Sequence, residues 1–453
     1  MASHGIARTN RSRTEEQRQQ DLDRIQKYRD LDDQIQSHVK QSNYSDPALF
    51  QLTTKILRLN PEYYTVWNVR RRCLISGSLS RRSAGLWRSR ASPSTSRSVT
   101  TKPSCAASSP SPSAATPAAP ATSPSPKRDG GSGTTPNEKK EHTTDNAEGK
   151  EEEDEKADIA ADTSIIQAEL NFTIPLLIEF PKCYWIWGYR SFLLSLCDAI
   201  LPAAAARDFW VAELALDSKM LTKDRRNFHA WSYRRFIVSA LESTAKTDGS
   251  DGSGGDAPTT TTNPKSMTES EFAYTYSMIK VDLSNFSAWH NRSKLALRLL
   301  DERGADDAAR KKFLEEELEL VREGLNVGPE DQSLWYYHQF LMDHITAVGA
   351  HKNAEDNEKG TTKELIAPNL SLADRREFVD REVTEIKDLL EDYADVKLIY
   401  EALLEYAMAY RAMGESDGDA ANQDEMMAWL AKLRELDPLR RGRWDDLEKS
   451  LKV

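Results

Sequence analysis

The chain has 453 residues, a net charge of −11 at pH 7 and a pI near 5.4. Because binding to a phosphate backbone needs a concentrated basic face, this acidic balance argues against nucleic acid as the main ligand. The sequence holds no run of about 18 apolar residues and no apolar signal core at its N-terminus, so we expect a cytoplasmic protein without stable membrane insertion.

The N-terminal third of the chain changes character twice. Residues 1–45 are predicted to be a tail followed by a charged helix that keeps one narrow apolar stripe. A first helical hairpin is predicted over 46–76, with Asn60-Pro61 as the break between its two helices. Residues 77–161 turn basic and Ser-rich, then Pro/Ala-rich, then acidic. This composition cannot bury enough apolar area to offset chain entropy, and it predicts a disordered insertion. Translated intron sequence is an alternative origin for this segment.

Helical periodicity returns after the insertion. Repeats two and three are predicted over 162–242, and repeats four and five over 267–348. A low-complexity, disordered loop is expected over 243–266, and a further flexible loop over 349–370. Residues 371–453 are predicted to form degenerate C-terminal repeats, because a terminal repeat must turn one face to water.

One motif recurs in every predicted repeat from the first to the fifth: an aromatic residue, a Trp three residues later and an Arg three residues after that. The copies are Tyr64/Trp67/Arg70, Tyr184/Trp187/Arg190, Phe228/Trp231/Arg234, Phe286/Trp289/Arg292 and the decayed Gln332/Trp335/His338. This spacing lies on one side of a helix, and we predict that the aromatic/Trp ladder is core. The recurring Arg is predicted to be a structural partner of carboxylates and helix ends, since a buried Arg must be paired.

The spacing of the motifs indicates the architecture. After the insertion, successive motif tryptophans lie 44, 58 and 46 residues apart, within reach of solenoids built from helix pairs. A second helix-like segment precedes each motif, so each repeat is predicted to be a helical hairpin. We therefore predict an all-α fold of stacked hairpins with long disordered insertions.

The motif sequences carry a family resemblance. NPEYYTVWNVRRRCL, FPKCYWIWGYRSFLL, DRRNFHAWSYRRFIV, DLSNFSAWHNRSKLA and EDQSLWYYHQFLM resemble the repeats of protein prenyltransferase alpha subunits. More narrowly, FPKCYWIWGYR and the opening HGIARTNRSRTEEQ are similar to the alpha subunits of Rab-type geranylgeranyltransferases. The resemblance implies a right-handed α–α superhelix and a heterodimer whose beta subunit holds zinc, the isoprenoid pocket and most catalytic groups. It also implies geranylgeranyl diphosphate as prenyl donor and Rab GTPases, presented by a Rab escort protein, as substrates. A magnesium requirement is left open.

The resemblance also implies site residues. Lys182 matches a family lysine near the lipid diphosphate, where a cation stabilises charge on the leaving group; a solvated Lys ahead of a helix is the alternative. Tyr184, Asn227 and His229 match alpha-subunit residues that face the beta active site, and Phe228 stands where the family commonly has Tyr. His4 resembles a terminal histidine that, in this family, can reach the partner's zinc when substrate is absent, which implies an autoinhibitory role.

No catalytic or metal-binding motif is visible in this chain. Its eight histidines form no H-E-x-x-H and no zinc spacing with cysteines, and neither a phosphate-binding loop nor a G-x-S-x-G is present. We therefore expect the metal on the partner chain. Two alternative functions remain: the alpha subunit shared by the farnesyl and type I geranylgeranyl enzymes, and a non-catalytic helical-repeat adaptor.

Overall fold

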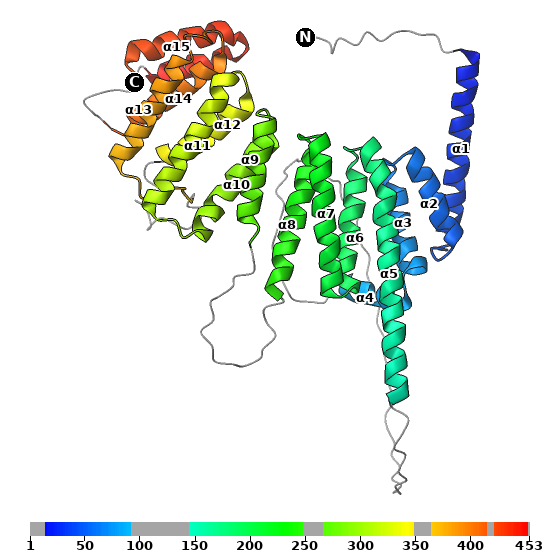
Figure 1. Ribbon diagram of the computed structural model, residues 1–453. Coiled ribbons are helices and arrows are strands. Elements are labelled where there is room, and N and C mark those ends of the chain that lie inside the picture. The colour runs from blue at the N-terminus through cyan, green and yellow to red at the C-terminus, as the bar shows by residue number, and fades with distance from the viewer. Residues whose placement is uncertain (1–13, 92–144, 248–265, 348–363, 415–420, 452–453) are drawn as a thin grey trace, which may run out of the picture. The chain divides into compact units, whose positions relative to one another are not determined.

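The computed structural model describes residues 14–91, 145–247, 266–347, 364–414 and 421–451. All regular secondary structure in these ranges is helical (Figure 1), which confirms the predicted all-α class for the part of the chain described. The helices are α1 (Glu15–Lys40), α2 (Pro47–Leu59), α3 (Tyr64–Cys73), α4 (Arg81–Ala91), α5 (Asp145–Glu179), α6 (Tyr184–Ile200), α7 (Ala203–Lys223), α8 (Phe228–Thr247), α9 (Thr268–Val281), α10 (Phe286–Glu302), α11 (Asp307–Val327), α12 (Gln332–Thr346), α13 (Leu372–Asp388), α14 (Lys397–Ala412), α15 (Gln423–Leu436) and α16 (Arg441–Leu451). A π-helical turn, Leu74–Ser78, extends α3, and a 3₁₀ turn, Pro438–Arg440, precedes α16.

The chain forms two compact units. The first comprises Met1–Phe172 with Ser195–Leu201, and the second comprises Thr173–Leu194 with Pro202–Val453. In the first unit, α1 begins at a capping box in which Thr14 and Gln17 satisfy each other's backbone N–H groups. Its apolar stripe is buried only towards its C-terminal half, at Leu31 and Ile35.

The first unit also corrects the predicted insertion. Inside the range 77–161, the structure has the helix α4 and the first half of α5. The buried carboxylate of Asp162 accepts hydrogen bonds from the backbone N–H and the hydroxyl of Ser80, at 2.9 and 2.8 Å, and thereby holds the start of α4. An arginine near the end of α4, Arg90, donates to the carbonyl of Asp198 at 2.7 Å. The predicted boundaries were therefore too wide on both sides, and residues 92–144 lie outside the described residues.

In the second unit, consecutive helices pair as antiparallel hairpins: α7 with α8, α9 with α10, α11 with α12, α13 with α14 and α15 with α16 (Figure 1). Their facing sides bury a continuous set of Leu, Ile, Val, Met and aromatic side chains. This burial is the main source of stability for helices of this length, which are marginal in isolation.

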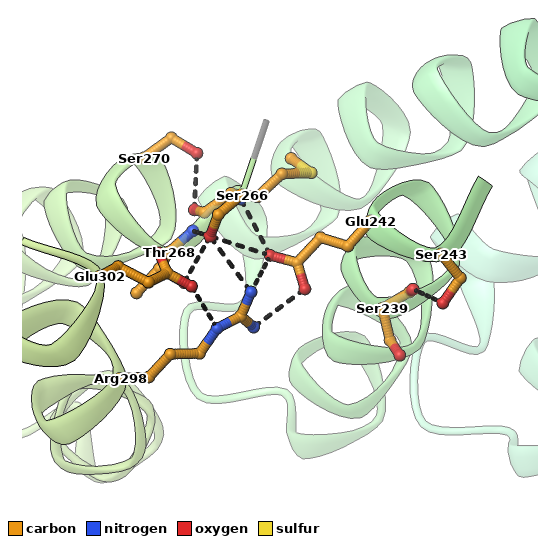
Figure 2. A network of polar contacts seen from close by, with 9 residues as sticks. Ser239, Glu242, Ser243, Ser266, Thr268, Ser270, Arg298 and Glu302 are labelled. Carbon is orange, nitrogen blue, oxygen red and sulfur yellow. Dashed lines mark hydrogen bonds and ion pairs between the residues drawn. The ribbon is translucent and has the colours of Figure 1, made fainter. Parts of the chain in front are cut away.

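A cluster of polar side chains links α8 to the start of α9 and to α10 (Figure 2). The Arg298 guanidinium donates to both Glu242 oxygens at 2.9 and 2.8 Å and to Glu302 at 2.7 Å. The same Glu242 carboxylate accepts from the backbone N–H of Met267 at 2.9 Å. Within the loop predicted over 243–266, residues up to Thr247 are helical and Ser266 belongs to this cluster, while residues 248–265 lie outside the described residues.

The flexible loop predicted over 349–370 is also shorter than expected. Leu365, Ile366 and Ala367 are buried, and the Ile366 N–H donates to the Nδ1 atom of His344 at 3.1 Å. The Ile366 carbonyl accepts from Arg310 at 3.0 Å. Two hydrogen bonds thus fix the apolar end of this predicted loop, whereas residues 349–363 lie outside the described residues.

The side chains of Cys73, Cys183 and Cys197 are buried, and burial raises the pKa of the Cys73 thiol to about 11. Among the described helices, none combines the length and the apolar character that a membrane crossing requires.

Candidate functional site

Each motif Trp is buried and fixes the loop that precedes its helix. Its indole N–H donates to the carbonyl of the residue six positions earlier. The five bonds are Trp67 to Pro61 at 2.8 Å, Trp187 to Pro181 at 2.9 Å, Trp231 to Arg225 at 2.8 Å, Trp289 to Leu283 at 2.8 Å and Trp335 to Pro329 at 2.6 Å. In the sixth hairpin, the Tyr400 hydroxyl makes the same bond to Ala394 at 2.8 Å. The motif therefore sets the geometry of one end of each hairpin that carries it, and Tyr400 does the same in the sixth.

The motif Arg is buried as well, and it joins neighbouring repeats. Its guanidinium binds both oxygens of a glutamate in the first helix of the next hairpin. These pairs are Arg70 with Glu169, Arg190 with Glu213, Arg234 with Glu271 and Arg292 with Glu317. We call each of these an Arg–Glu latch. A two-pronged, desolvated ion pair holds both position and angle, so the latches define how one hairpin meets the next.

The latch also reaches back into its own hairpin. The second guanidinium nitrogen donates to a hydroxyl sixteen or seventeen residues earlier, for example from Arg70 to Thr53 at 2.9 Å and from Arg292 to Thr275 at 3.3 Å. In the fifth motif a histidine replaces the arginine: His338 contacts Glu382 at 3.0 Å and the Tyr406 hydroxyl at 2.8 Å. All three side chains are buried, so this junction is polar but lacks a guanidinium.

One latch carries an extra acid. Asp217 occupies the position that Thr53, Thr173 and Thr275 hold in their hairpins, and it lies 3.7 Å from Arg234. Its side chain is fully buried, and neither of its oxygens accepts a hydrogen bond. Burial raises the pKa of this carboxyl to about 8, and the nearby carboxylates of Glu271 and Glu213 add to the effect of burial.

The first aromatic of the motif is not core, which corrects the expectation for the aromatic/Trp ladder. Tyr64, Tyr184, Phe228 and Phe286 are about half to two-thirds exposed, whereas the tryptophans three residues later are buried. Each of these aromatic residues is the first residue of its helix. Exposed rings in a repeated position point to a partner surface rather than to packing within the chain.

Lys182 lies in the short loop between α5 and α6, and that loop is rigid. The Pro181 carbonyl accepts two hydrogen bonds, from the Trp187 indole at 2.9 Å and from the Asn227 amide at 2.9 Å. The Cys183 N–H donates to Phe180 at 3.0 Å. The Lys182 side chain itself is 68% exposed, and its ammonium is 3.6 Å from the Asp224 carboxylate.

Two other predicted site residues lie next to this loop. The Tyr184 ring, 61% exposed, is 6.1 Å from the His229 ring between centroids, and Phe228 is 4.1 Å from His229. The structure therefore brings Tyr184, Phe228 and His229 together at the N-terminal ends of α6 and α8. This end of the hairpins offers an exposed cation, an imidazole and aromatic surface.

Asn227 differs from its expected place at the exposed site. Its side chain is 1% exposed, and its amide oxygen accepts from the His229 and Ala230 N–H groups at 3.0 and 3.4 Å. Together with its bond to Pro181, this makes Asn227 the cap of α8 and the tie to the Lys182 loop. Asn285 repeats the arrangement one hairpin later, donating to Arg225 and accepting from Ala288.

Among the described residues, no group of three or more His, Cys, Asp and Glu side chains is arranged so that it could hold a metal ion. His4 lies outside the described residues. The side chains near Lys182 fit the binding of an anion better than the coordination of a metal cation.

Sequence reasoning missed the acidic half of the latches. A glutamate stands 18 residues before the motif Trp of each hairpin from the second to the fifth, and also before Tyr400 of the sixth. These residues are Glu169, Glu213, Glu271, Glu317 and Glu382. The signal was present in the spacing, but it lies outside the motif helix and shows only when whole hairpins are aligned.

Comparison with known proteins finds a family whose sequence pattern matches this chain. The sequence pattern described as "Protein prenyltransferase alpha subunit repeat" matches residues 47–76, 166–197, 210–241, 268–299 and 314–345, and each match contains one Trp motif. A Candida albicans protein, "Geranylgeranyl transferase type-2 subunit alpha", is 27% identical over 375 residues, which are 78% of this chain and 76% of that protein. The Saccharomyces cerevisiae protein of the same name is 27% identical over 61% of this chain and 71% of its own length. The Rattus norvegicus protein of that name is 34% identical over 181 residues, which are 40% of this chain and 26% of the rat protein.

Proposed function

The chain belongs to the protein prenyltransferase alpha subunit repeat family, and from this premise we propose that it is the alpha subunit of a heterodimeric type-2 geranylgeranyl transferase. The enzyme would transfer the geranylgeranyl group from geranylgeranyl diphosphate to C-terminal cysteines of Rab GTPases presented by a Rab escort protein. Transfer needs an activated thiolate and an apolar pocket for the lipid. We assign both, with zinc, to a beta subunit.

The observation that carries the proposal for this chain's own chemistry is the exposed ammonium of Lys182 on a loop fixed by three hydrogen bonds. When the bond between the prenyl carbon and the diphosphate oxygen breaks, negative charge grows on the diphosphate. A cation held in place at that point stabilises the transition state more than the ground state. Tyr184 and His229 lie beside the loop and supply surface for the same ligand or for the partner that holds it.

The exposed first aromatics of the second, third and fourth motifs are proposed to contact the beta subunit. Each of Tyr184, Phe228 and Phe286 starts the second helix of its hairpin, and all three residues lie in the second compact unit. Aromatic rings are favoured anchors in protein interfaces, because they bury much area for few lost rotamers. His229 and Lys182 would then face the partner's active site at the edge of that interface.

The two alternative functions receive less support. The curated relatives from fungi and mammals carry the type-2 name, which favours this enzyme over the farnesyl and type I enzymes. The accessible Lys182, next to Tyr184 and His229, favours an enzyme component over an adaptor that has lost its site.

Co-purification and transfer assays test the proposal. The chain is expressed with a type-2 beta subunit, and geranylgeranyl transfer is measured onto a Rab with two C-terminal cysteines plus escort protein, and onto a CaaX peptide. We expect transfer only by the heterodimer and only onto the Rab. Transfer by the alpha chain alone, or preference for the CaaX peptide, contradicts the assignment.

A further inference from the structure

The contact between Lys182 and Asp224 belongs to a pattern that recurs along the hairpins. Lys182 stands five residues before its motif Trp, and Asp224 stands seven residues before the next one. Arg226 and Asp282 hold the same two positions one hairpin later, and they also form an ion pair. We call such a contact an edge pair.

The two edge pairs differ in strength. Arg226 grips Asp282 with two hydrogen bonds, at 2.9 and 2.7 Å, and the bond from Arg226 lowers the pKa of the Asp282 carboxyl. Lys182 makes a single contact with Asp224 at 3.6 Å, which is beyond a normal hydrogen bond. The guanidinium of Arg226 is therefore held tightly by Asp282. The ammonium of Lys182 is attracted by Asp224 but remains able to bind another anion.

Both ends of the looser pair stand on fixed backbone. The Asp224 N–H donates to Met220 at 3.0 Å at the end of α7, and the Asp224 carbonyl accepts from the Asn227 N–H at 3.2 Å. The Pro181 carbonyl, next to Lys182, accepts from the Trp187 indole and from Asn227. The Asp224 side chain is one-third exposed, so its carboxylate lies at the surface on a backbone that these hydrogen bonds fix.

A lysine at the surface has four rotatable bonds and many positions for its ammonium. A carboxylate at a fixed place narrows these positions before the ligand arrives, and a more highly charged diphosphate then displaces so weak a partner. An arginine in the tight form of the edge pair would lack this freedom.

We propose that Asp224 is a positioning residue, which holds the Lys182 ammonium where the leaving diphosphate takes it over. This inference rests on the proposed function and assigns a role to a second residue of the same site. It predicts opposite effects on binding and on turnover, because Asp224 both orients the lysine and repels the anion that the lysine receives.

Steady-state kinetics of the full heterodimer with geranylgeranyl diphosphate as varied substrate test the inference. Asp224→Asn is expected to lower kcat about threefold to fivefold, the scale of one surface ion pair, while the KM for the diphosphate falls or stays constant. In a Lys182→Ala background, Asp224→Asn is expected to cause no further loss of kcat. Asp224→Glu, which keeps the charge, is expected to recover most of kcat.

Asp282→Asn is the matched control, since it breaks the tight edge pair of the next hairpin. We expect it to lower the melting temperature and to leave kcat unchanged. An unchanged kcat in Asp224→Asn, or an equal loss in the Lys182→Ala background, overturns the positioning role while the proposed function stands. A wild-type heterodimer that transfers no geranylgeranyl group overturns both.

Discussion

Arg70 and Glu169 are 99 residues apart in the chain, yet their side chains meet in two hydrogen bonds of 2.7 Å in a buried site. The pair joins α3 to α5, so the first hairpin is latched to the second across the long insertion. Arg70 also lies over the rings of Phe50 and Phe172, at 4.1 and 4.3 Å from their centroids. The cation is thus enclosed by rings, hydroxyls and one carboxylate, with no access to water that could replace Glu169.

Removal of one latch partner should therefore be costly. Glu169→Ala leaves the Arg70 guanidinium buried without a counter-charge, and we expect a loss of about 3–5 kcal/mol in the free energy of unfolding. Glu269→Ala is the control, because Glu269 pairs with Arg303 at 2.6 Å with both side chains about half exposed or more. Its expected cost is within about 1 kcal/mol. Urea denaturation of the two variants decides between these values, and equal losses would contradict a special role for the buried latch.

The buried Asp217 should make stability depend on pH. Its pKa is about 8 in the folded chain, against an ordinary value of 3.8, so the folded state favours the protonated acid. Its contribution is fully present below about pH 4 and is lost as the pH rises through 8. Asp217→Thr, which introduces the residue of three other hairpins, is expected to add about 1–3 kcal/mol near neutral pH and to flatten this slope.

Denaturation midpoints at pH 5 and pH 8.5 measure the Asp217 effect. The reverse change, Thr275→Asp, serves as the control and should destabilise the chain, more so at the higher pH. A wild-type chain that is more stable at pH 8.5 than the Asp217→Thr variant would show that the ion pair with Arg234 outweighs the cost of burying the carboxylate.

Lys182 should matter for turnover and not for folding. Lys182→Ala is expected to lower the rate of geranylgeranyl transfer by the heterodimer about tenfold or more, because a cation near the leaving diphosphate is lost. The melting temperature should stay unchanged, since the side chain is mostly exposed and makes one weak ion pair. Lys223→Ala, at an exposed lysine near the end of α7, is the control and should transfer at the wild-type rate.

The exposed aromatic at the start of α6 should contribute to assembly. Tyr184→Ala is expected to weaken binding of the beta subunit by about 1 kcal/mol or more, a fivefold or larger rise in Kd. Val211→Ala removes an equally accessible apolar side chain from α7, the first helix of its hairpin, and should leave Kd unchanged. Titration calorimetry with purified subunits gives both values; a Tyr184→Ala heterodimer of wild-type affinity removes this residue from the interface.

Sequence patterns predicted the helical hairpins well because Trp67, Trp187 and their counterparts recur at one helical phase and mark the second helix of each repeat. They failed where the contacts of a single side chain determine whether a segment is ordered or which way a residue faces. The hydrogen bonds from Ser80 to Asp162, at the start of α4, extend order into a segment whose composition indicates disorder. Asn227 illustrates the same limit, since the motif places it beside the site residues but only the contact with Pro181 shows that it faces inward.

Each Arg–Glu latch is directional: the second helix of a hairpin supplies the base, and the first helix of the following hairpin supplies the acid. Any internal hairpin therefore carries an arginine for the hairpin that follows and a glutamate for the hairpin that precedes it. A duplicated hairpin inserted between two neighbours could form a latch with each of them without any further substitution. Tandem duplication could therefore lengthen the array without loss of a latch. The series of latches ends where the arginine is replaced, by His338 in the fifth motif and then by Leu403, three residues after Tyr400.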